Sequence, residues 1–230
     1  MHASYLNAEF KVGTSKITFT ENQLHRIVLE YGEALMHIQF IYNSYLKNTP
    51  WDIDFELDLS KPGKVLTPQE HYLIGNELQR NGIKLSSICL DPLKDSEAVN
   101  DNLQLHCEIA DTFGYRLSFK NADIAMNDTA AAMKYLKGKV HFKMNNILWM
   151  SAIELAKALD ADLFGKLCAA CGCEPTADAA DRALVLGYRK ALNPKEEGNV
   201  AADMKAFLKA HHAEYAAAIK ENVAAKLKNI

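Results

Sequence analysis

Three times in the middle of the chain, a stretch with helical character ends on a glycine and a strand-like run follows at once. Glycine suits this place because it readily adopts the left-handed conformation that closes a helix. Strands that alternate with helices at such intervals are typical of βαβ units and of a parallel sheet. The sequence therefore predicts an α/β fold. The glycines and the runs behind them are Gly82 with 83–90, Gly114 with 115–120, and Gly138 with 139–144.

Two helix starts carry a capping signal, in which a threonine is followed three residues later by glutamine or glutamate. Thr20 with Gln23 predicts a long amphipathic helix that runs to about residue 46. Thr67 with Glu70 predicts a second helix, and Pro68 stands at its first position, where a missing N–H is tolerated.

The segment between these two helices, residues 51–59, alternates with a period of two. Its apolar residues share one face of the expected strand, and its acidic residues share the other. A strand with one apolar and one acidic face is therefore expected here. The acidic residues are Asp54, Glu56 and Asp58.

After Asn146 the pattern is helical to the end of the chain. Much of this part is alanine-rich, and alanine favours helix while it buries little surface. We predict a β/α barrel-like domain over residues 1–160 and an all-helical C-terminal extension over 161–230, packed on the same domain. The expected helices are 147–159, 162–171, 176–192 and 201–227.

The composition is that of an ordinary globular protein, with 49% hydrophobic and 24% charged residues. The 26 basic and 29 acidic residues give a net charge of −3, so no general attraction to nucleic acid or to an anionic membrane is expected. No apolar run reaches the roughly 20 residues of a spanning helix. The first residues lack the pattern of a secretory signal. A cytoplasmic protein is the expectation.

The five cysteines are an odd number, and Cys168, Cys171 and Cys173 lie close together. Reduced thiols in the cytoplasm are the simplest account. Three thiols within six residues could begin a zinc or iron–sulfur site whose fourth ligand comes from elsewhere. A closed metal site normally has a second ligand pair, so we favour the alternative in which these cysteines are small hydrophobic residues at a helix end.

Polar residues stand at the expected carboxyl ends of the strands, where open parallel sheets and barrels place their sites. A charged face on a single strand would fit a protected sheet edge. Three such strands in succession cannot all be edges, so one face is expected to line a barrel mouth. The candidate residues are Glu56, Asp58, Asp91, Lys120, Asn121, His141, Lys143 and Asn145.

Carboxylates with a histidine can hold a divalent metal, and carboxylates with lysines can move protons beside a carbonyl group. The spacing of the candidates matches no diagnostic motif, since the chain has no HExxH, GxSxG, Walker loop or GxGxxG behind a strand. By themselves, these residues point to sugar or carbonyl chemistry without naming a reaction.

Several short stretches carry a resemblance through their order and spacing. They are 19–24 (FTENQL), 31–35 (YGEAL), 55–57 (FEL), 67–74 (TPQEHYLI), 114–118 (GYRLS) and 141–143 (HFK). Together they resemble the later, C-terminal part of the tagaturonate epimerase family, bacterial enzymes that interconvert hexuronates. The resemblance covers about residues 5–165. It implies a metal-dependent isomerase of carbohydrate metabolism with a barrel-like fold, in other words a TIM-barrel-like or partial barrel.

The resemblance implies epimerisation of a keto-uronate. This reaction would need an acid and a base near one carbon of the substrate, and a cation that holds the substrate carboxylate or stabilises an enolate. The cation would be zinc, manganese or magnesium. The implied residues are the metal ligands Glu56 and His141, the proton-transferring residues Asp58, Lys120 and Lys143, and the substrate-binding residues Asn121, Asn145 and His71.

Two other functions stay open. A Schiff-base aldolase or lyase would use Lys143 or Lys120 as its nucleophile. A shortened, inactive relative would bind a ligand or act as an interaction subunit; residues 120–123 stand where the family usually carries a histidine. About five strands are expected where a barrel needs eight, so a homo-oligomer or a partner subunit is expected to cover the sheet edges.

Overall fold

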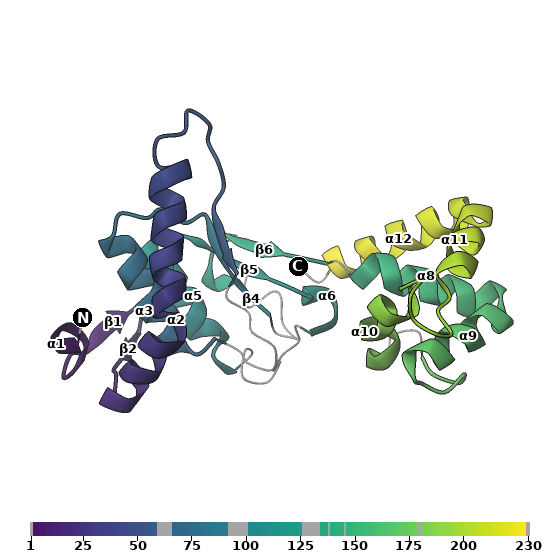
Figure 1. Ribbon diagram of the computed structural model, residues 1–230, viewed down its shortest axis with the longest axis horizontal. Helices are drawn as coiled ribbons and strands as arrows, with labels where there is room; N and C mark the ends of the chain where they lie inside the picture. Colours follow the sequence, from purple (N-terminus) through teal and green to yellow (C-terminus); the bar gives the residue numbers. More distant parts are fainter. Residues whose placement is uncertain are drawn as a thin grey trace. The chain divides into compact units, whose positions relative to one another are not determined.

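The computed structural model describes residues 2–58, 66–91, 101–125, 134–137, 139–144, 146–178 and 181–228. The chain divides into two compact units, unit 1 over residues 1–143 and unit 2 over residues 144–230. In Figure 1, unit 1 runs from purple to teal and contains the strands, and unit 2 runs from green to yellow and is helical.

Unit 1 begins with a short helix and a β-hairpin and continues with the β/α units. Its helices are α1 (His2–Tyr5), α2 (Glu21–Ile41), α3 (Pro68–Arg80), α5 (Leu103–Phe113) and α6 (Ala122–Ala125), with a π-helical turn η1 (Tyr42–Leu46) behind α2. Its strands are β1 (Phe10–Val12), β2 (Ser15–Ile17), β3 (Glu56–Asp58), β4 (Ser87–Leu90), β5 (Arg116–Phe119) and β6 (Val140–Phe142).

Both capping signals begin their helices as expected. The Thr20 hydroxyl accepts a hydrogen bond of 3.2 Å from the Gln23 backbone N–H, and the Glu70 carboxylate accepts one of 2.8 Å from the Thr67 backbone N–H. The reciprocal bonds are also present, so each helix start satisfies backbone donors that have no partner within the helix.

Strands β3, β4, β5 and β6 form a parallel sheet in chain order among the described residues. The helices before β4 and β5 end at Gly82 and Gly114, whose φ angles are +70° and +79°, the left-handed region expected for these glycines. The α/β prediction is therefore confirmed. The described strands make an open sheet with β3 and β6 at its edges, and a closed barrel stays a prediction.

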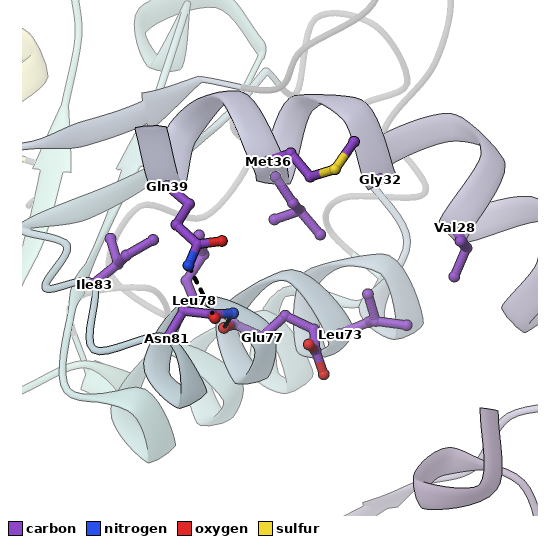
Figure 2. A pocket seen from close by; sticks show the side chains of 10 residues that line it. Val28, Gly32, Met36, Gln39, Leu73, Glu77, Leu78, Asn81 and Ile83 are labelled. Carbon is purple, nitrogen blue, oxygen red and sulfur yellow. Dashed lines mark hydrogen bonds between the residues drawn. The ribbon is translucent and has the colours of Figure 1, made fainter. Parts of the chain in front are cut away.

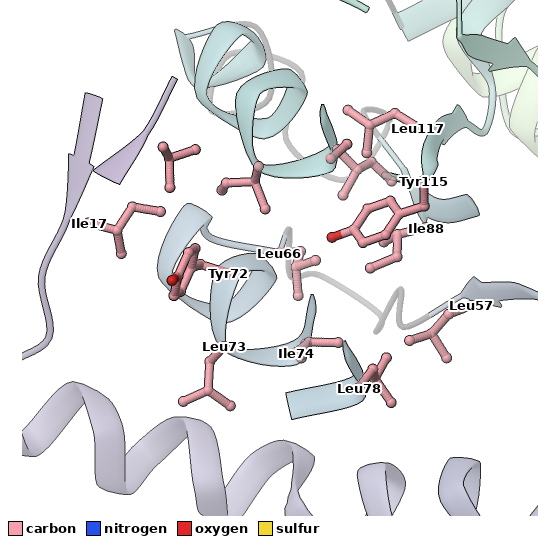
Figure 3. Close-up of a cluster of buried hydrophobic side chains, with 14 of the residues drawn as sticks. Ile17, Leu57, Leu66, Tyr72, Leu73, Ile74, Leu78, Ile88, Tyr115 and Leu117 are labelled. Carbon is pink, nitrogen blue, oxygen red and sulfur yellow. The ribbon is translucent and has the colours of Figure 1, made fainter. Parts of the chain in front are cut away.

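One face of this sheet is apolar and faces α3 and α5, while α2 packs on α3. Figure 3 shows Ile74 and Leu78 of α3 on the side of the strand residues Leu57 and Ile88, and Leu73 on the side of α2. Each of these side chains is at most 6% exposed, and burying one contributes roughly 1.5–3 kcal/mol. This burial fixes which side of every strand faces inward, and so leaves the opposite side for polar residues.

Unit 2 consists of α8 (Asn146–Leu159), α9 (Ala161–Cys171), α10 (Arg182–Ala191), α11 (Ala201–Ala210) and α12 (His212–Leu227), which confirms the expected helical C-terminal segment. The boundary between the units lies at residue 143 rather than at 160, because α8 packs on α9, α10 and α12. Its Trp149 and Ile153 are in the helical core, and the Trp149 indole N–H donates a 3.0 Å hydrogen bond to the Leu184 carbonyl.

Two helix predictions in unit 2 need correction in detail. The helix expected over 201–227 is broken at His211, whose φ and ψ of −111° and 35° are not helical. The helix expected from residue 176 begins at Arg182, where Asp181 caps it. Among the described residues, no helix combines the length and the apolar character needed to cross a membrane.

Candidate active site

The face of the parallel sheet that lies opposite the apolar core is polar. Side chains alternate along a strand, and aligned residues of neighbouring parallel strands share a face. One row of aligned residues crosses the whole sheet on this side. It runs through Asp58, Cys89, Ser118 and His141. We define the polar face as this row together with Glu56, Ser87, Lys120 and Lys143, which share its side of the sheet.

Lys143, just behind β6, reaches across the polar face to β3. Its ammonium group forms an ion pair with the Glu56 carboxylate and lies 3.7 Å from the Cys89 sulfur of β4. The Ser87 hydroxyl donates a 2.8 Å hydrogen bond to the other Glu56 oxygen. Burial alone would raise the pKa of Glu56, but the hydrogen bonds from Lys143 and Ser87 outweigh burial and hold the pKa below its ordinary value.

Lys120, just behind β5, reaches β3 in the same way. Its ammonium group forms an ion pair with the Asp58 carboxylate, and this hydrogen bond raises the pKa of Lys120. The next residue, Asn121, donates a 2.8 Å hydrogen bond to Asp91, which follows β4. Asn121 has a φ of +51°, so the chain turns sharply where β5 ends.

The four charged side chains of these pairs balance one another in formal charge. Burial would lower the pKa of Lys143, but its hydrogen bond to Glu56 raises it, so both lysines are ammonium ions at neutral pH. Burial raises the pKa of Cys89, which keeps its sulfur as a thiol. Two ammonium groups beside two carboxylates can bind an anion and can exchange protons with it.

The structure thus brings together four of the predicted site residues: Glu56, Asp58, Lys120 and Lys143. Asn121 lies beside them, bonded to Asp91. Three polar-face residues were missed by the sequence reasoning, namely Ser87, Cys89 and Ser118. Ser87 and Cys89 lie four and two residues before Asp91, and Ser118 lies two residues before Lys120. Because side chains alternate along a strand, residues at this spacing point to the same side. This spacing is the signal that could have identified them.

His141 shares the polar face, but it is exposed and lies on β6, three strand positions from Glu56 on β3. Neighbouring strands lie about 4.8 Å apart, so these two backbones are separated by about 14 Å. The long side chain of Lys143 can span this distance to the Glu56 carboxylate. The imidazole of His141 is shorter and cannot extend as far toward Glu56. The sheet therefore does not bring His141 and Glu56 together.

His71 lies apart from the polar face, in the core formed by α3, α5 and the residue before β5. It is completely buried, with its Nδ1 atom 2.9 Å from the Nδ1 atom of His106 and its Nε2 atom 2.8 Å from the Tyr115 hydroxyl. Burial lowers the pKa of both histidines, that of His106 to about 4. Both are therefore neutral at pH 7. Asn145 lies outside the described residues.

The polar face fits a divalent cation poorly. Its two carboxylates already bind lysines, and Cys89 is a protonated thiol. Across the ranges that the structure describes, no three or more His, Cys, Asp or Glu side chains are grouped so that they could hold a metal ion. The metal prediction built on Glu56 and His141 stays a prediction.

The three clustered cysteines of unit 2 are free thiols at the end of α9 and just behind it. Burial raises the pKa of Cys168 and of Cys171 to about 11. The Cys173 sulfur lies 3.5 Å from the Cys168 carbonyl oxygen. Cys168 and Cys171 are therefore protonated, and all three cysteines pack against the helical core, Cys168 fully and the other two partly buried.

Two of the hollows formed by the described residues of unit 1 lie away from the polar face. Figure 2 shows one of about 110 Å³ between α2 and α3, lined by Gly32 and Met36 of α2 and by Leu73 of α3, where Gln39 donates a 3.2 Å hydrogen bond to Asn81. The other, of about 420 Å³, lies where α3 ends and β5 begins, beside Tyr115. Neither hollow is lined by paired acids and bases comparable to the polar face.

Comparison with known proteins gives the relatives of this chain. A family model described as tagaturonate epimerase (UxaE) matches residues 1–181. The tagaturonate/fructuronate epimerase of Thermotoga maritima is 25% identical over 174 residues, which are 71% of this chain and 36% of that protein. This chain therefore spans about a third of the length of its curated relative.

Solved structures support the fold. A glycerol complex and the native form of the fructuronate-tagaturonate epimerase UxaE from Cohnella laeviribosi align with TM-scores of 0.81 and 0.80 at 20% sequence identity. Each alignment covers 99% of this chain and 56% of the solved chain. The family model covers most of the chain and includes every stretch that carries the sequence resemblance, so the chain belongs to the tagaturonate epimerase family.

Proposed function

We propose that the polar face binds keto-hexuronates and interconverts fructuronate and tagaturonate. The observation that carries the proposal is the convergence of Lys120 and Lys143, which directly follow the carboxyl ends of β5 and β6, on the carboxylates of β3. Ligand sites of open parallel sheets lie at this end of the strands. Family membership supports the class of substrate.

The two carboxylates and the two ammonium groups have complementary roles in this proposal. The lysines bind the carboxylate of the sugar acid and stabilise negative charge that develops on a substrate oxygen. Asp58 accepts a proton from the substrate, and the Lys120 ammonium group beside it supplies one. Asn121 helps to orient a hydroxyl group of the sugar acid next to this pair.

The test is to incubate the chain with D-fructuronate or D-tagaturonate in D₂O and to follow the sugar acids by NMR. Conversion of one into the other supports the proposal, and deuterium in the product locates the proton transfer. Asp58→Asn and Lys120→Met are expected to lower the rate by about a hundredfold or more. Lys139→Met is the matched control, because Lys139 is exposed just before β6. Binding without conversion would favour the shortened, ligand-binding relative.

The Schiff-base alternative is less well supported by the polar face. A lysine nucleophile must lose its proton, and burial or a neighbouring cation normally lowers its pKa for this purpose. The pKa values of Lys120 and Lys143 are instead raised by their carboxylate partners. Borohydride trapping with a keto sugar is therefore expected to leave the intact mass of the protein unchanged.

We also propose that a second copy of the chain, or a partner subunit, covers surfaces that are exposed here. Strands β3 and β6 are edges of the described sheet, and α2 carries exposed apolar side chains on its outer side. These are Leu29, Met36 and Phe40, exposed by 87%, 67% and 58%. Light scattering of the purified chain tests this proposal; a monomer at high concentration would contradict self-association.

A further inference from the structure

Each carboxylate on the polar face already has an ammonium partner from another strand. Lys143 binds Glu56, and Lys120 binds Asp58. A divalent cation at either carboxylate would have to displace a lysine and would then lie close to two ammonium groups, which repel it. The charge that a metal would bring to this face is thus already present.

The other donors of the polar face do not complete a metal site. The Cys89 sulfur lies 3.7 Å from the Lys143 ammonium group, but burial keeps this thiol protonated, and a metal binds the thiolate. His141 is exposed on β6, at the opposite edge of the sheet from both carboxylates. The family resemblance implied a cation at Glu56 and His141, and the geometry of the described residues disagrees with that ligand set.

We propose that this chain binds the carboxylate of a hexuronate through the ammonium groups of Lys120 and Lys143, without a divalent cation at Glu56 or Asp58. Each ammonium group has three N–H donors. A lysine can therefore keep its carboxylate partner and still donate to an oxygen of the ligand. Only the class of ligand rests on the function proposed above. That no divalent cation binds at Glu56 or Asp58 is inferred from the ion pairs of these two carboxylates with Lys143 and Lys120.

The cation half of the proposal is tested without any sugar acid. The full chain is treated with EDTA, dialysed, and titrated with MnCl₂ and with ZnCl₂ by calorimetry, alongside Glu56→Gln and Asp58→Asn. We expect the same isotherms for all three proteins, since neither carboxylate holds the metal. A saturable, stoichiometric site that is lost in either variant would overturn the proposal.

The lysine half is tested by calorimetric titration with D-tagaturonate, in EDTA and in excess MnCl₂. We expect Kd to agree within about twofold between the two conditions, and Lys143→Met to weaken binding by about tenfold or more in both. Lys139→Met, on the same side of β6, is expected to leave Kd unchanged within about twofold. Binding that requires added metal, or that ignores Lys143→Met, would overturn the proposal.

Two controls keep the outcomes separate. Circular dichroism reports whether Lys143→Met folds, and Lys143→Gln replaces it if it does not. If no sugar acid binds in either condition, the proposed function and the lysine half both fail, while the metal titration still decides whether Glu56 and Asp58 hold a cation.

Discussion

The ammonium group of Lys143 and the carboxylate of Glu56 form an ion pair that spans the described sheet, from the end of β6 to β3 at the other edge. The two side chains are only 23% and 27% exposed. The pair therefore ties the two edge strands together over the polar face, and lies where solvent screens it only in part.

A double-mutant cycle measures this tie. We expect Glu56→Gln and Lys143→Met to show a coupling free energy of about 0.5–1 kcal/mol in urea unfolding, the upper part of the range for partly exposed pairs. The more exposed pair of Lys166 and Asp203, at 63% and 52% exposure, serves as the control and is expected to couple less. Equal coupling in the two pairs would mean that shielding by the polar face adds nothing.

The same pair gives a pH dependence whose sign follows from its two pKa values. The pKa of Glu56 is lowered from 4.5 on folding. The ionised carboxylate therefore stabilises the folded chain fully above about pH 4.5, and this stabilisation is lost as the pH falls through the folded-state pKa. The pKa of Lys143 is raised from 10.5, so its stabilisation is lost only as pH rises above that value. We expect the difference in Tm between wild type and Glu56→Gln to be largest between these limits. A difference that grows toward acid pH would contradict the pair.

The buried pair of His71 and His106 predicts a loss of stability in mild acid. The pKa of His106 falls from 6.5 to about 4 on folding, so between these pH values the unfolded chain binds more protons than the folded chain. The free energy of unfolding therefore decreases as the pH is lowered. From pH 7 to pH 5, His106 alone should reduce the free energy of unfolding by roughly 2 kcal/mol.

Urea unfolding at both pH values checks this loss. His106→Gln is expected to flatten the dependence, whatever its stability at pH 7. His37→Gln, at an exposed position of α2, should keep the wild-type dependence. An unchanged slope in His106→Gln would show that the proton uptake occurs elsewhere.

These histidines also show where sequence reasoning ends. Local signals located the helix starts at Thr20 and Thr67, because capping involves only neighbouring residues. The alternation of residues 51–59 placed Glu56 and Asp58 on one face, again from local geometry. His71 meets His106 only when two helices pack together, and no spacing along the chain contains that contact.

The same reasoning explains the other differences. The ion pairs of Lys120 and Lys143 join residues that are far apart in sequence, and their partners depend on the order of strands in the sheet. The positions of the strands in the sequence predicted the four charged residues of these pairs, but they did not predict which lysine binds which carboxylate. The unit boundary at residue 143 likewise follows from what α8 packs against, which its amphipathic pattern alone does not specify.

The cysteines predict a graded reactivity in the native chain. Cys107 is completely buried, and burial raises its pKa to about 12, so it should react with iodoacetamide only after unfolding. Cys173, which is partly exposed, is the internal control and is expected to react first. Mass spectrometry after labelling at pH 8, with and without urea, gives the order. Early labelling of Cys107 in the native chain would contradict its packing.

Replacing Gly75, in the middle of α3, is expected to cause a steric clash beside the buried His71 and Tyr115. A Cβ atom there would lie 2.6 Å from the Phe113 ring and 2.8 Å from the Tyr115 hydroxyl, which bonds to His71. Gly75→Ala should therefore lower the free energy of unfolding by about 1–3 kcal/mol. Gly32→Ala in α2 is the matched control: its Cβ would meet only Val28, at 3.8 Å, so the helix should gain about 0.5–1 kcal/mol. If urea unfolding shows that Gly75→Ala is also stabilising, Phe113 and Tyr115 are not packed against α3 as described.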